Sequence, residues 1–567
     1  MSKSFPLASP AGDRPRPAYD LSPPELSVLR RRWEAALMVL FLAWMFLVCC
    51  FPLTDTDFWW HLRTGELIVE RGWVPQHDWF TYTDADRPWI DLHWGFQLIV
   101  TALYHLGGVN LIIVFKSAVL AAAAAIACLS AGRTLPAWQR YLIWLGPLIA
   151  ISGRGYERPE ILSLLFMAAW FWILSRSEER PKLLWLLPVV QVMWTNCHSL
   201  FVLGLAIGGC WAIDRTLRQA WGGRFGLEPV ARSVPLWQVW TVLAVSAAAS
   251  FINPYFEQGA FFPLVVYRKF SVEQDFYSVR IGEFQRPVKF LWDYGLRNIY
   301  LDIELLVACV AALSFVVLAW RRALWSPGRL LLFAAFGHLA WEASRNTSIF
   351  ALVAGVVTCA NFAAAARARS ERDFEPILLT QLAILSALAL IVAVVTGVWN
   401  DIGGERKPFG FGERPAWFMH GPSRFAGTAG MPEHALVFHN GQAPVYIYHN
   451  GPQRTVFMDA RLEVSTRQTF EKYEEIQRLM AKGDRRWGEI ARAPDGKLPA
   501  VLLDSRNSLA LANGLLQQPE WRLVYADPTG GVFIETRLAQ ELNLPAVDPI
   551  RMSSPEASEM MRMLRQP

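Results

Sequence analysis

Long apolar runs dominate the first 400 residues of this 567-residue chain. An apolar stretch of about 20 residues is long enough to cross the hydrocarbon core of a bilayer as an α-helix. Twelve candidates are residues 33–53, 91–107, 109–131, 138–153, 160–175, 183–198, 199–217, 236–256, 301–320, 327–343, 347–366 and 376–399. Hydrophobic residues make up 53% of the chain and charged residues 18%, against roughly 25% charged residues in soluble proteins. The sequence therefore predicts a polytopic α-helical membrane protein and excludes a disordered or collagen-like chain.

Basic clusters beside the apolar runs set the expected orientation. They lie at residues 30–32, 176–182, 215–224, 321–329 and 367–372. Lys and Arg accumulate in cytoplasmic loops, so these clusters predict a cytoplasmic N-terminus and place everything after Trp399 on the outer side of the inner (plasma) membrane. Residues 1–32 are polar and rich in proline, and we expect them to form a disordered cytoplasmic tail.

The number of spans conflicts with this orientation. An inner N-terminus and an outer C-terminus require an odd number of crossings, whereas twelve runs are present. Leu135-Pro136 and Gly146-Pro147 interrupt the region 109–158, so we expect segment 138–153 to be a re-entrant or broken helix buried in protein. We therefore predict eleven or twelve spans. The expected transmembrane domain covers residues 33–399, with outer loops at 54–90 and 257–300.

Residues 400–545 alternate short apolar runs with helical patterns. Expected strands lie at 435–439, 445–448, 455–459, 500–504, 521–527 and 532–536, and expected helices lie near 466–481 and 507–517. Such alternation is typical of a small α/β domain, here on the extracytoplasmic side. Asp459 and Arg461 follow one predicted strand, where they would either bind a ligand or tie a loop. Residues 546–567 are expected to form a polar tail.

The first outer loop carries an unusual concentration of charge. Asp55 and Asp57 come directly after the first apolar run, and His61, Arg63 and Glu66 follow at helical spacing. Asp57 and His61, with Glu66 less closely, are expected to share one face of a short helix on the membrane surface. A purely structural interpretation is that the two aspartates cap this helix, and Asp55 is the better candidate for a cap. A carboxylate pair, a His and an Arg at the membrane surface instead favour a site for a charged, lipid-linked substrate.

Further polar residues gather at the expected outer ends of other spans. The candidate substrate-binding residues are His61, Arg63, Glu66, His93, Arg154, Arg158, Asn196, His198, Glu283 and Arg345. Pro159 suits the first turn of a helix, so Arg154 and Arg158 would lie at a helix N-terminus and form an anion site. A purely structural interpretation is also open for these residues: Arg154 and Arg158 would extend from the membrane interface to water, and His198 would have a structural role. The apolar patch 261–266 is too short to span and would form a lid over the site.

The first outer loop resembles that of a known superfamily. The acidic pair after the first span, the surface helix and the segment Gly72-Trp-Val-Pro75 are similar to the first outer loop of GT-C glycosyltransferases. These membrane enzymes use polyprenyl-phosphate sugars and include protein O-mannosyltransferases, aminoarabinose transferases and oligosaccharyltransferase catalytic subunits. The apolar layout resembles that of bacterial members of the superfamily that act on the cell envelope.

The resemblance implies an activity and its partners. It implies transfer of a sugar from a polyprenyl-phosphate donor to a lipid, glycan or protein acceptor on the extracytoplasmic face. It also implies that an aspartate of this loop is the catalytic base or a ligand of a divalent metal. Asp57 and Asp55 are both candidates for that role, because the Asp-Thr-Asp spacing differs from the usual acidic pair. The other expected partners are membrane lipids. Nucleic-acid binding has no support, because no basic stripe lies outside the cytoplasmic loops.

Two other classes of protein remain open from the sequence. One is a non-enzymatic membrane protein, such as a lipid-glycan transporter or an assembly factor. A transporter is expected to have repeat symmetry and ionisable groups near the middle of the bilayer, whereas here these groups gather at the outer ends. The other is a glycan polymerase or ligase of a different fold, which need not place its base just after the first span.

Overall fold

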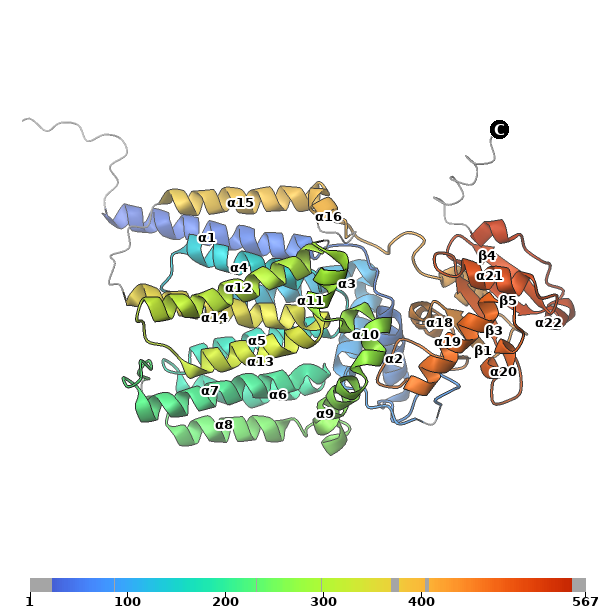
Figure 1. Ribbon diagram of the computed structural model, residues 1–567, viewed down its shortest axis with the longest axis horizontal. Helices are drawn as coiled ribbons and strands as arrows, with labels where there is room; N and C mark the ends of the chain where they lie inside the picture. Colours follow the sequence, from blue (N-terminus) through green and yellow to red (C-terminus); the bar gives the residue numbers. More distant parts are fainter. Residues whose placement is uncertain are drawn as a thin grey trace, which may run out of the picture.

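The computed structural model describes residues 23–85, 87–230, 232–296, 298–368, 377–402 and 407–552. It consists of a helical bundle and a smaller α/β domain at one end of that bundle (Figure 1). We call the end that meets the α/β domain the domain end and the other end the basal end. The expected tail before residue 23 and the last part of the polar tail, from residue 553, lie outside the described residues.

In the described part of the chain, eleven helices of the bundle lie roughly side by side (Figure 1). They are α1 (Pro23–Val48), the second half of α3 (Trp94–Ser130), α4 (Ala137–Ser152), α5 (Glu160–Ser175), α6 (Leu187–Thr195), α7 (Val202–Trp221), α8 (Leu236–Ala249), α12 (Ile299–Trp320), α13 (Pro327–Glu342), α14 (Thr347–Arg367) and α15 (Ile377–Val395). Five helical stretches in the described residues are long and apolar enough to cross a membrane: Trp94–Ser130, Ser199–Trp221, Ile299–Trp320, Ser344–Arg367 and Ile377–Val395. The predicted polytopic, mainly helical membrane protein is thereby confirmed.

Two expectations about the bundle are wrong. Residues 23–32, expected in the disordered tail, are the first turns of α1, where Arg30 and Glu34 pair at i,i+4 spacing. Segment 138–153 is not broken, because α4 runs continuously through Pro147. Close packing supports it there: Trp144 lies against Gly355 of α14, and Gly146 lies against Val307 of α12.

The segment that fails to run along the bundle is instead the first half of α3. Gly107 and Gly108 break this helix, and Gly108 has a φ of +61°, which a glycine adopts at little cost. Gly95 donates to the carbonyl of Asn196 at 2.9 Å, while Asn110 accepts from Gly412 at 2.8 Å. Both ends of the first half are therefore held at the domain end. The apolar run 91–107 therefore packs against α2 of the first loop and does not span the membrane.

Short helices cover the domain end of the bundle. They are α2 (Asp57–Arg71), α9 (Phe256–Val272), α10 (Gln274–Arg280), η3 (Gly282–Phe284), α11 (Pro287–Tyr294), η4 (Ser344–Asn346) and α16 (Val398–Ile402); two 3₁₀ turns within the bundle are η1 (Pro181–Leu186) and η2 (Ser199–Phe201). Helix α2 ends at Arg71, and the next residue, Gly72, caps it with a left-handed backbone conformation (φ of +76°). Gly65 brings α2 and α3 together, since a Cβ there would be 2.5 Å from the Gln97 carbonyl oxygen.

The α/β domain is built on a five-stranded mixed sheet. Its strands are β1 (His434–Phe438), β2 (Thr455–Val456), β3 (Ala500–Asp504), β4 (Trp521–Asp527) and β5 (Gly530–Glu535), in the order β2-β1-β3-β5-β4. Strand β1 is parallel to β2 and β3, while β5 is antiparallel to β3 and β4. The helices are α17 (His420–Ala426), α18 (Ala443–Asn450), α19 (Arg467–Ala481), α20 (Trp487–Ala491), α21 (Leu509–Leu516) and α22 (Thr536–Glu541), with 3₁₀ turns η5 (Asn440–Gln442) and η6 (Pro549–Met552).

Details of the domain differ from the sequence-based prediction. Residues 445–448 form part of helix α18, not a strand, because Pro444 starts a helix that packs on α2. The first residues of the expected polar tail pack on the sheet, where Val547 donates to the Leu523 carbonyl at 2.9 Å. The first loop also joins the sheet edge: Val456 donates to Phe80 at 2.8 Å, and Tyr82 donates to Val456 at 3.0 Å. The loop and the domain therefore share one core.

Candidate functional site

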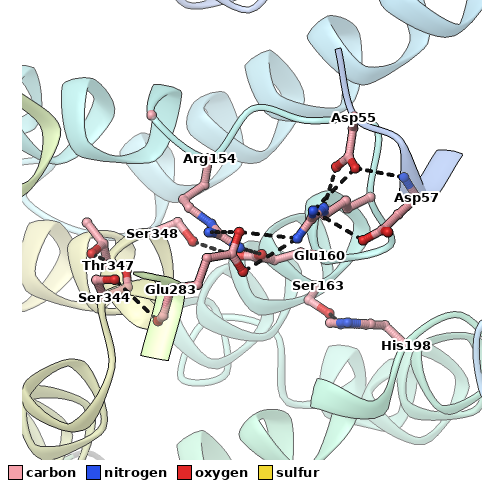
Figure 2. A network of polar contacts seen from close by, with 12 residues as sticks. Asp55, Asp57, Arg154, Glu160, Ser163, His198, Glu283, Ser344, Thr347 and Ser348 are labelled. Carbon is pink, nitrogen blue, oxygen red and sulfur yellow. Dashed lines mark hydrogen bonds and ion pairs between the residues drawn. The ribbon is translucent and has the colours of Figure 1, made fainter. Parts of the chain in front are cut away.

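A chain of alternating charges (Figure 2) borders the cavity between the bundle and the α/β domain. Arg158 is at its centre, and its guanidinium contacts Asp55 at 3.2 Å, Asp57 at 3.1 Å and Glu283 at 3.3 Å. Arg154 continues the chain, with contacts of 3.0 Å to both Glu283 and Glu160. We call these six residues the charge chain: Asp55, Asp57, Arg154, Arg158, Glu160 and Glu283. The chain contains four carboxylates and two guanidiniums, so its carboxylates outnumber its guanidiniums by two.

Helix ends position the members of the charge chain. Asp55 accepts the backbone N–H of Asp57 at 3.0 Å, which holds the first residue of α2, although the N-cap residue of this helix is Thr56 and not Asp55. Arg154 and Arg158 lie in the connection between α4 and α5, just before Pro159. Glu160 begins α5 and accepts from Ser348 of α14 at 2.7 Å. Residues from four distant segments of the chain thus converge at the domain end.

Asp57 differs from Asp55 in how tightly it is held. The Asp55 side chain is 3% exposed, and it binds both Arg158 and the Asp57 backbone. The Asp57 side chain is 22% exposed, and Arg158 is its one ion-pair partner within the described residues. Burial of the carboxylate raises the pKa of Asp57 to about 7; the Arg158 charge opposes this effect, and the neighbouring Asp55 and Glu283 charges add to it. Asp57 can therefore exchange a proton near neutral pH.

Glu283 has the opposite character. It lies between Arg154 and Arg158, and burial alone would raise its pKa. The two arginines, together with Arg345, outweigh burial and hold the pKa of Glu283 well below its usual range. Glu283 therefore stays ionised and keeps both guanidiniums in place. The charge chain therefore contains one carboxylate that stays ionised, Glu283, and one that titrates near neutral pH, Asp57.

Two cavities meet the charge chain from different sides. The polar cavity has a volume of about 690 Å³ and lies between the bundle and the α/β domain; Asp55, Arg158 and Glu283 form its bundle wall. His439 and Arg506 are on its domain wall. The apolar cavity has a volume of about 460 Å³ and is lined by Glu160 and His198 and by side chains of α7, α9, α13 and α14. The charge chain thus contacts both a water-accessible space and an apolar space.

Arg345 is the cation of the apolar cavity. Its guanidinium lies 5.0 Å from the centre of the Phe284 ring, and it has no hydrogen bond or ion pair with any residue that the structure describes. The side chain is half-buried, so its guanidinium is available inside the cavity to bind an anionic ligand.

Three of the predicted binding residues do not reach the charge chain. Arg63 donates to the Gly451 carbonyl at 2.8 Å, which attaches α2 to the domain, and it pairs with Glu66 within α2 at 2.9 Å. Asn196 accepts from Trp94 at 3.0 Å and donates to Ile252 at 2.8 Å, which ties loops together. The expectation that Asp57 and Glu66 share one face is wrong, because Glu66 turns toward His105.

The histidines form a buried cluster beside the charge chain. The rings of His61 and His198 lie 5.5 Å and 5.4 Å from that of His93. Burial lowers the pKa of His61 and of His198, so both are neutral near pH 7. Burial acts in the same direction on His93, but its hydrogen bond and charge interaction with Asp91 outweigh it and raise its pKa. His198 also hydrogen-bonds Ser163 at 2.7 Å (Figure 2) and lines the apolar cavity.

The sequence-based prediction missed the domain wall of the polar cavity. His439 follows β1, and Asp504 and Arg506 end and follow β3; these strands are adjacent and parallel. After β1 the chain continues to β2 on one side of the sheet, and after β3 it continues to β4 and β5 on the other side. The carboxyl ends of β1 and β3 therefore form a crevice of the kind in which such sheets bind ligands. Asp504 and Arg506 are two positions apart, like Asp459 and Arg461, which the sequence did indicate as a candidate pair.

Asp459 and Arg461 tie the domain to the first loop. Arg461 is fully buried and binds Asp459 and Asp78, each at 2.6 Å. Its guanidinium also lies 4.3 Å from the Trp89 ring. Of the two interpretations of Asp459 and Arg461, a loop tie is therefore the one that the contacts support.

The acidic pair does not fit a divalent metal site. Across the described residues, no three His, Cys, Asp or Glu side chains are arranged to hold a metal ion. Asp55 and Asp57 direct their oxygens at the Arg158 guanidinium, which lies between them where a shared cation would have to lie. A guanidinium and a divalent cation repel each other, so the donor set suits an organic cation instead.

Comparison with known proteins supports the fold. The sequence matches no protein-family model and no curated protein significantly. The structure is similar to the apo oligosaccharyltransferase of Archaeoglobus fulgidus, with a TM-score of 0.52, 13% identity and coverage of 90% of this chain and 75% of that one. It is also similar to AglB of the same organism in complex with an inhibitory peptide and a dolichol-phosphate, with a TM-score of 0.53, 11% identity and coverage of 91% and 75%. ArnT from Cupriavidus metallidurans is a weaker match, with a TM-score of 0.47, 12% identity and coverage of 90% and 98%.

These similarities define the class of the protein. The chain is a multi-pass membrane protein with a GT-C-like fold and an appended α/β domain. The resemblance that the first loop suggested is confirmed at the level of the fold.

Proposed function

We propose that this protein is a membrane glycosyltransferase that transfers a sugar from a polyprenyl-phosphate donor to an acceptor hydroxyl. One observation carries the proposal: the charge chain contacts both the apolar cavity and the polar cavity, so one acid–base site is accessible to a lipid and to a water-soluble group. Asp55 lines the polar cavity and Glu160 lines the apolar cavity, while Asp57 contacts the Arg158 guanidinium that also lines the polar cavity. A transporter or an assembly factor would not require a titrating carboxylate beside these cavities. The GT-C-like fold supports the same conclusion.

The donor would occupy the apolar cavity. Its polyprenyl chain would lie against the apolar side chains of α9, α13 and α14, and its phosphate would bind the unpaired guanidinium of Arg345. Arg154 and Arg158 lie close enough to add to the positive potential there. A dolichol-phosphate is bound in the AglB structure, which has a similar fold.

The acceptor would occupy the polar cavity. Its walls carry hydrogen-bonding and charged side chains from both the bundle and the domain, including Arg158, His439 and Arg506. Such a wall suits a polar group that presents a hydroxyl, whether it belongs to a glycan, a lipid headgroup or a protein. The position of the cavity directs that hydroxyl toward the charge chain.

Asp57 would act as the general base. With a pKa of about 7 it is partly deprotonated at neutral pH, and it can take the proton from the acceptor hydroxyl. The hydroxyl oxygen then forms a bond to the anomeric carbon while the bond from that carbon to the phosphate oxygen breaks, with inversion. The polyprenyl phosphate leaves as an anion, which Arg345 and Arg158 stabilise. Glu283 holds Arg158 in position throughout.

The reaction would take place on the extracytoplasmic face. The basic clusters of the sequence gather at the basal end, as the positive-inside rule requires for the cytoplasmic side. The domain end, with both cavities, then faces outward. Reporter fusions after residues 420 and 540 test this orientation, and cytoplasmic activity from both fusions would contradict it.

A binding and turnover experiment tests the proposed activity. Full-length protein in nanodiscs is titrated with a polyprenyl phosphate, and the release of polyprenyl phosphate from lipid-linked sugars extracted from native membranes is followed by mass spectrometry. We expect Arg345→Gln to weaken lipid-phosphate binding about tenfold or more, because a charge-assisted hydrogen bond is lost.

The matched control is Arg537→Gln, which removes the same charge from an exposed arginine that pairs with Glu541 on the α/β domain, away from the apolar cavity. This control should bind the lipid phosphate like the wild type. Equal binding by wild type and Arg345→Gln, together with no release of polyprenyl phosphate by the wild type, would refute the proposal.

A further inference from the structure

A third cavity lies at the basal end of the bundle, far from the charge chain. It has a volume of about 380 Å³ and lies between α5, α7, α13 and α14. We call it the basal cavity. It shares no lining residue with the polar cavity or the apolar cavity. The proposed glycosyl transfer makes no use of it.

The basal cavity changes character along its length. On α7 its wall is formed by Ile207, Trp211, Asp214 and Arg218, which are three or four residues apart and so lie on one helix face. On α14 the wall runs from the apolar Val356 to Arg367 at the helix end. Eleven residues of helix correspond to about 16 Å. The cavity is therefore long, charged at the basal end and apolar toward the middle of the bundle.

The charged end has more guanidinium groups than its acids neutralise. Among the residues that the structure describes, the cavity is lined by four arginines, Arg133, Arg218, Arg329 and Arg367, and by two acids, Asp214 and Glu228. Glu228 has three arginines within reach: Arg329 at 2.6 Å, Arg218 at 3.4 Å and Arg367 at 3.7 Å.

Asp214 is already used by the fold. It accepts from Ser326 at 2.6 Å, from the Gly328 backbone at 2.9 Å and from Arg218 at 2.9 Å. Arg133 lies 3.7 Å from Glu179, which is outside the lining. With Glu179 counted as well, the arginines still exceed the acids. A net positive charge is therefore held at the mouth of an apolar channel.

We propose that the basal cavity binds an anionic phospholipid. The lipid phosphate would bind between Arg218, Arg329 and Arg367, and one acyl chain would extend along the apolar faces of α7 and α14. The apolar half distinguishes this ligand from a free phosphate ion, which gains nothing from Ile207 or Val356. Basic pockets between transmembrane helices on the cytoplasmic side are suited to anionic headgroups, and the basal end is the expected cytoplasmic end. This inference does not depend on the proposed function.

Native mass spectrometry of the full-length protein tests the proposal. The probes are phosphatidylglycerol, phosphatidylcholine and inorganic phosphate. We expect the wild type to retain phosphatidylglycerol at least tenfold more strongly than phosphatidylcholine. We expect Arg367→Gln to reduce that preference about tenfold, because the Arg367 side chain is 57% exposed and its loss removes a phosphate contact with little effect on the fold.

Two further variants separate the alternatives. Arg224→Gln removes an exposed charge near the same end but outside the lining, so it should behave like the wild type. Ala360→Phe narrows the apolar half of the cavity without changing any charge, so it should displace the lipid. Equal retention of the two lipids by the wild type would overturn the proposal. So would competition by millimolar inorganic phosphate or unchanged lipid binding in both Arg367→Gln and Ala360→Phe.

Discussion

Asp57→Asn is the substitution that tests the proposed mechanism most directly. The change keeps the shape of the side chain and its ability to hydrogen-bond, but it removes the negative charge and the basicity. Asp57 makes one ion pair in the described chain, at 3.1 Å to Arg158, and Arg158 keeps Asp55 and Glu283 as partners in the variant. The charge chain should therefore keep its geometry, and any loss of activity can be assigned to the lost base.

The expected loss of rate follows from the role of the carboxylate. Loss of a general base typically costs about a hundredfold to ten-thousandfold in rate. The wild-type rate should also rise with pH through about 7, as Asp57 loses its proton. The residual rate of Asp57→Asn should lack that rising limb. A variant with the same fold but no rise near pH 7 would identify Asp57 as the titrating group.

Stability gives an independent readout with a predicted sign. The pKa of Asp57 is raised from 3.8 to about 7 in the folded protein, so the native state favours the protonated carboxyl. The stabilisation from this group is complete below pH 3.8 and is lost as the pH rises through 7. The shift already includes the opposing effect of the Arg158 charge, and it corresponds to roughly 4 kcal/mol. Asp57→Asn should thus be at least as stable as the wild type at pH 8.

Asp55→Asn is the matched control. Asp55 is 3% exposed and binds both Arg158 and the first turn of α2, so its loss should lower the unfolding temperature at every pH. Thermal unfolding in nanodiscs at pH 5 and pH 8, beside sugar-transfer rates for all three proteins, completes the assay. A wild-type rate in purified Asp57→Asn would refute the reasoning. Unfolding of Asp57→Asn at a much lower temperature than the wild type at pH 8 would refute the assignment of the pKa.

Two further predictions concern the parts that hold the site together. Arg461→Leu leaves the buried carboxylates of Asp78 and Asp459 without a cation, so we expect a loss of about 3–5 kcal/mol in unfolding free energy, measured by denaturant titration; a loss below 1 kcal/mol would contradict this. Gly65→Val places a Cβ against the Gln97 carbonyl, so α2 must shift; we expect a loss of about 1–3 kcal/mol and reduced transfer activity, and an unchanged unfolding temperature would count against it.

Much of the charge chain could be predicted from the sequence because of where its members lie. Asp57 and Arg158 each stand beside an apolar run, and Glu283 lies in the long outer loop between two such runs, so all three were expected at the outer surface of the membrane. What the sequence could not supply was their pairing. Asp55 and Arg158 are 103 positions apart and meet because the ends of α1, α4 and α5 come together. No local pattern encodes that contact.

The failed expectations share one physical cause, which is contact with a second element that the sequence does not reveal. Glu66 was assigned to the face of Asp57 on the assumption that α2 lies on the membrane with one face in solvent. In the structure α2 is covered by α3 on one side and by α18 on another, so its Trp60 and Leu67 are buried. The short apolar run 445–448 forms a helix for the same reason, because it packs on α2.

The contacts between the first loop and the α/β domain bear on how the acceptor would be selected. Arg461 binds Asp78 of the loop inside a closed core, and Arg63 of α2 binds the Gly451 carbonyl of the domain. Asp57 is the first residue of α2, so the proposed base lies on the helix that these contacts fasten to the domain. The same domain carries His439 and Arg506 on the wall of the polar cavity. We therefore expect the shape and polarity of this cavity, to which the bundle and the domain both contribute, to select the proposed acceptor.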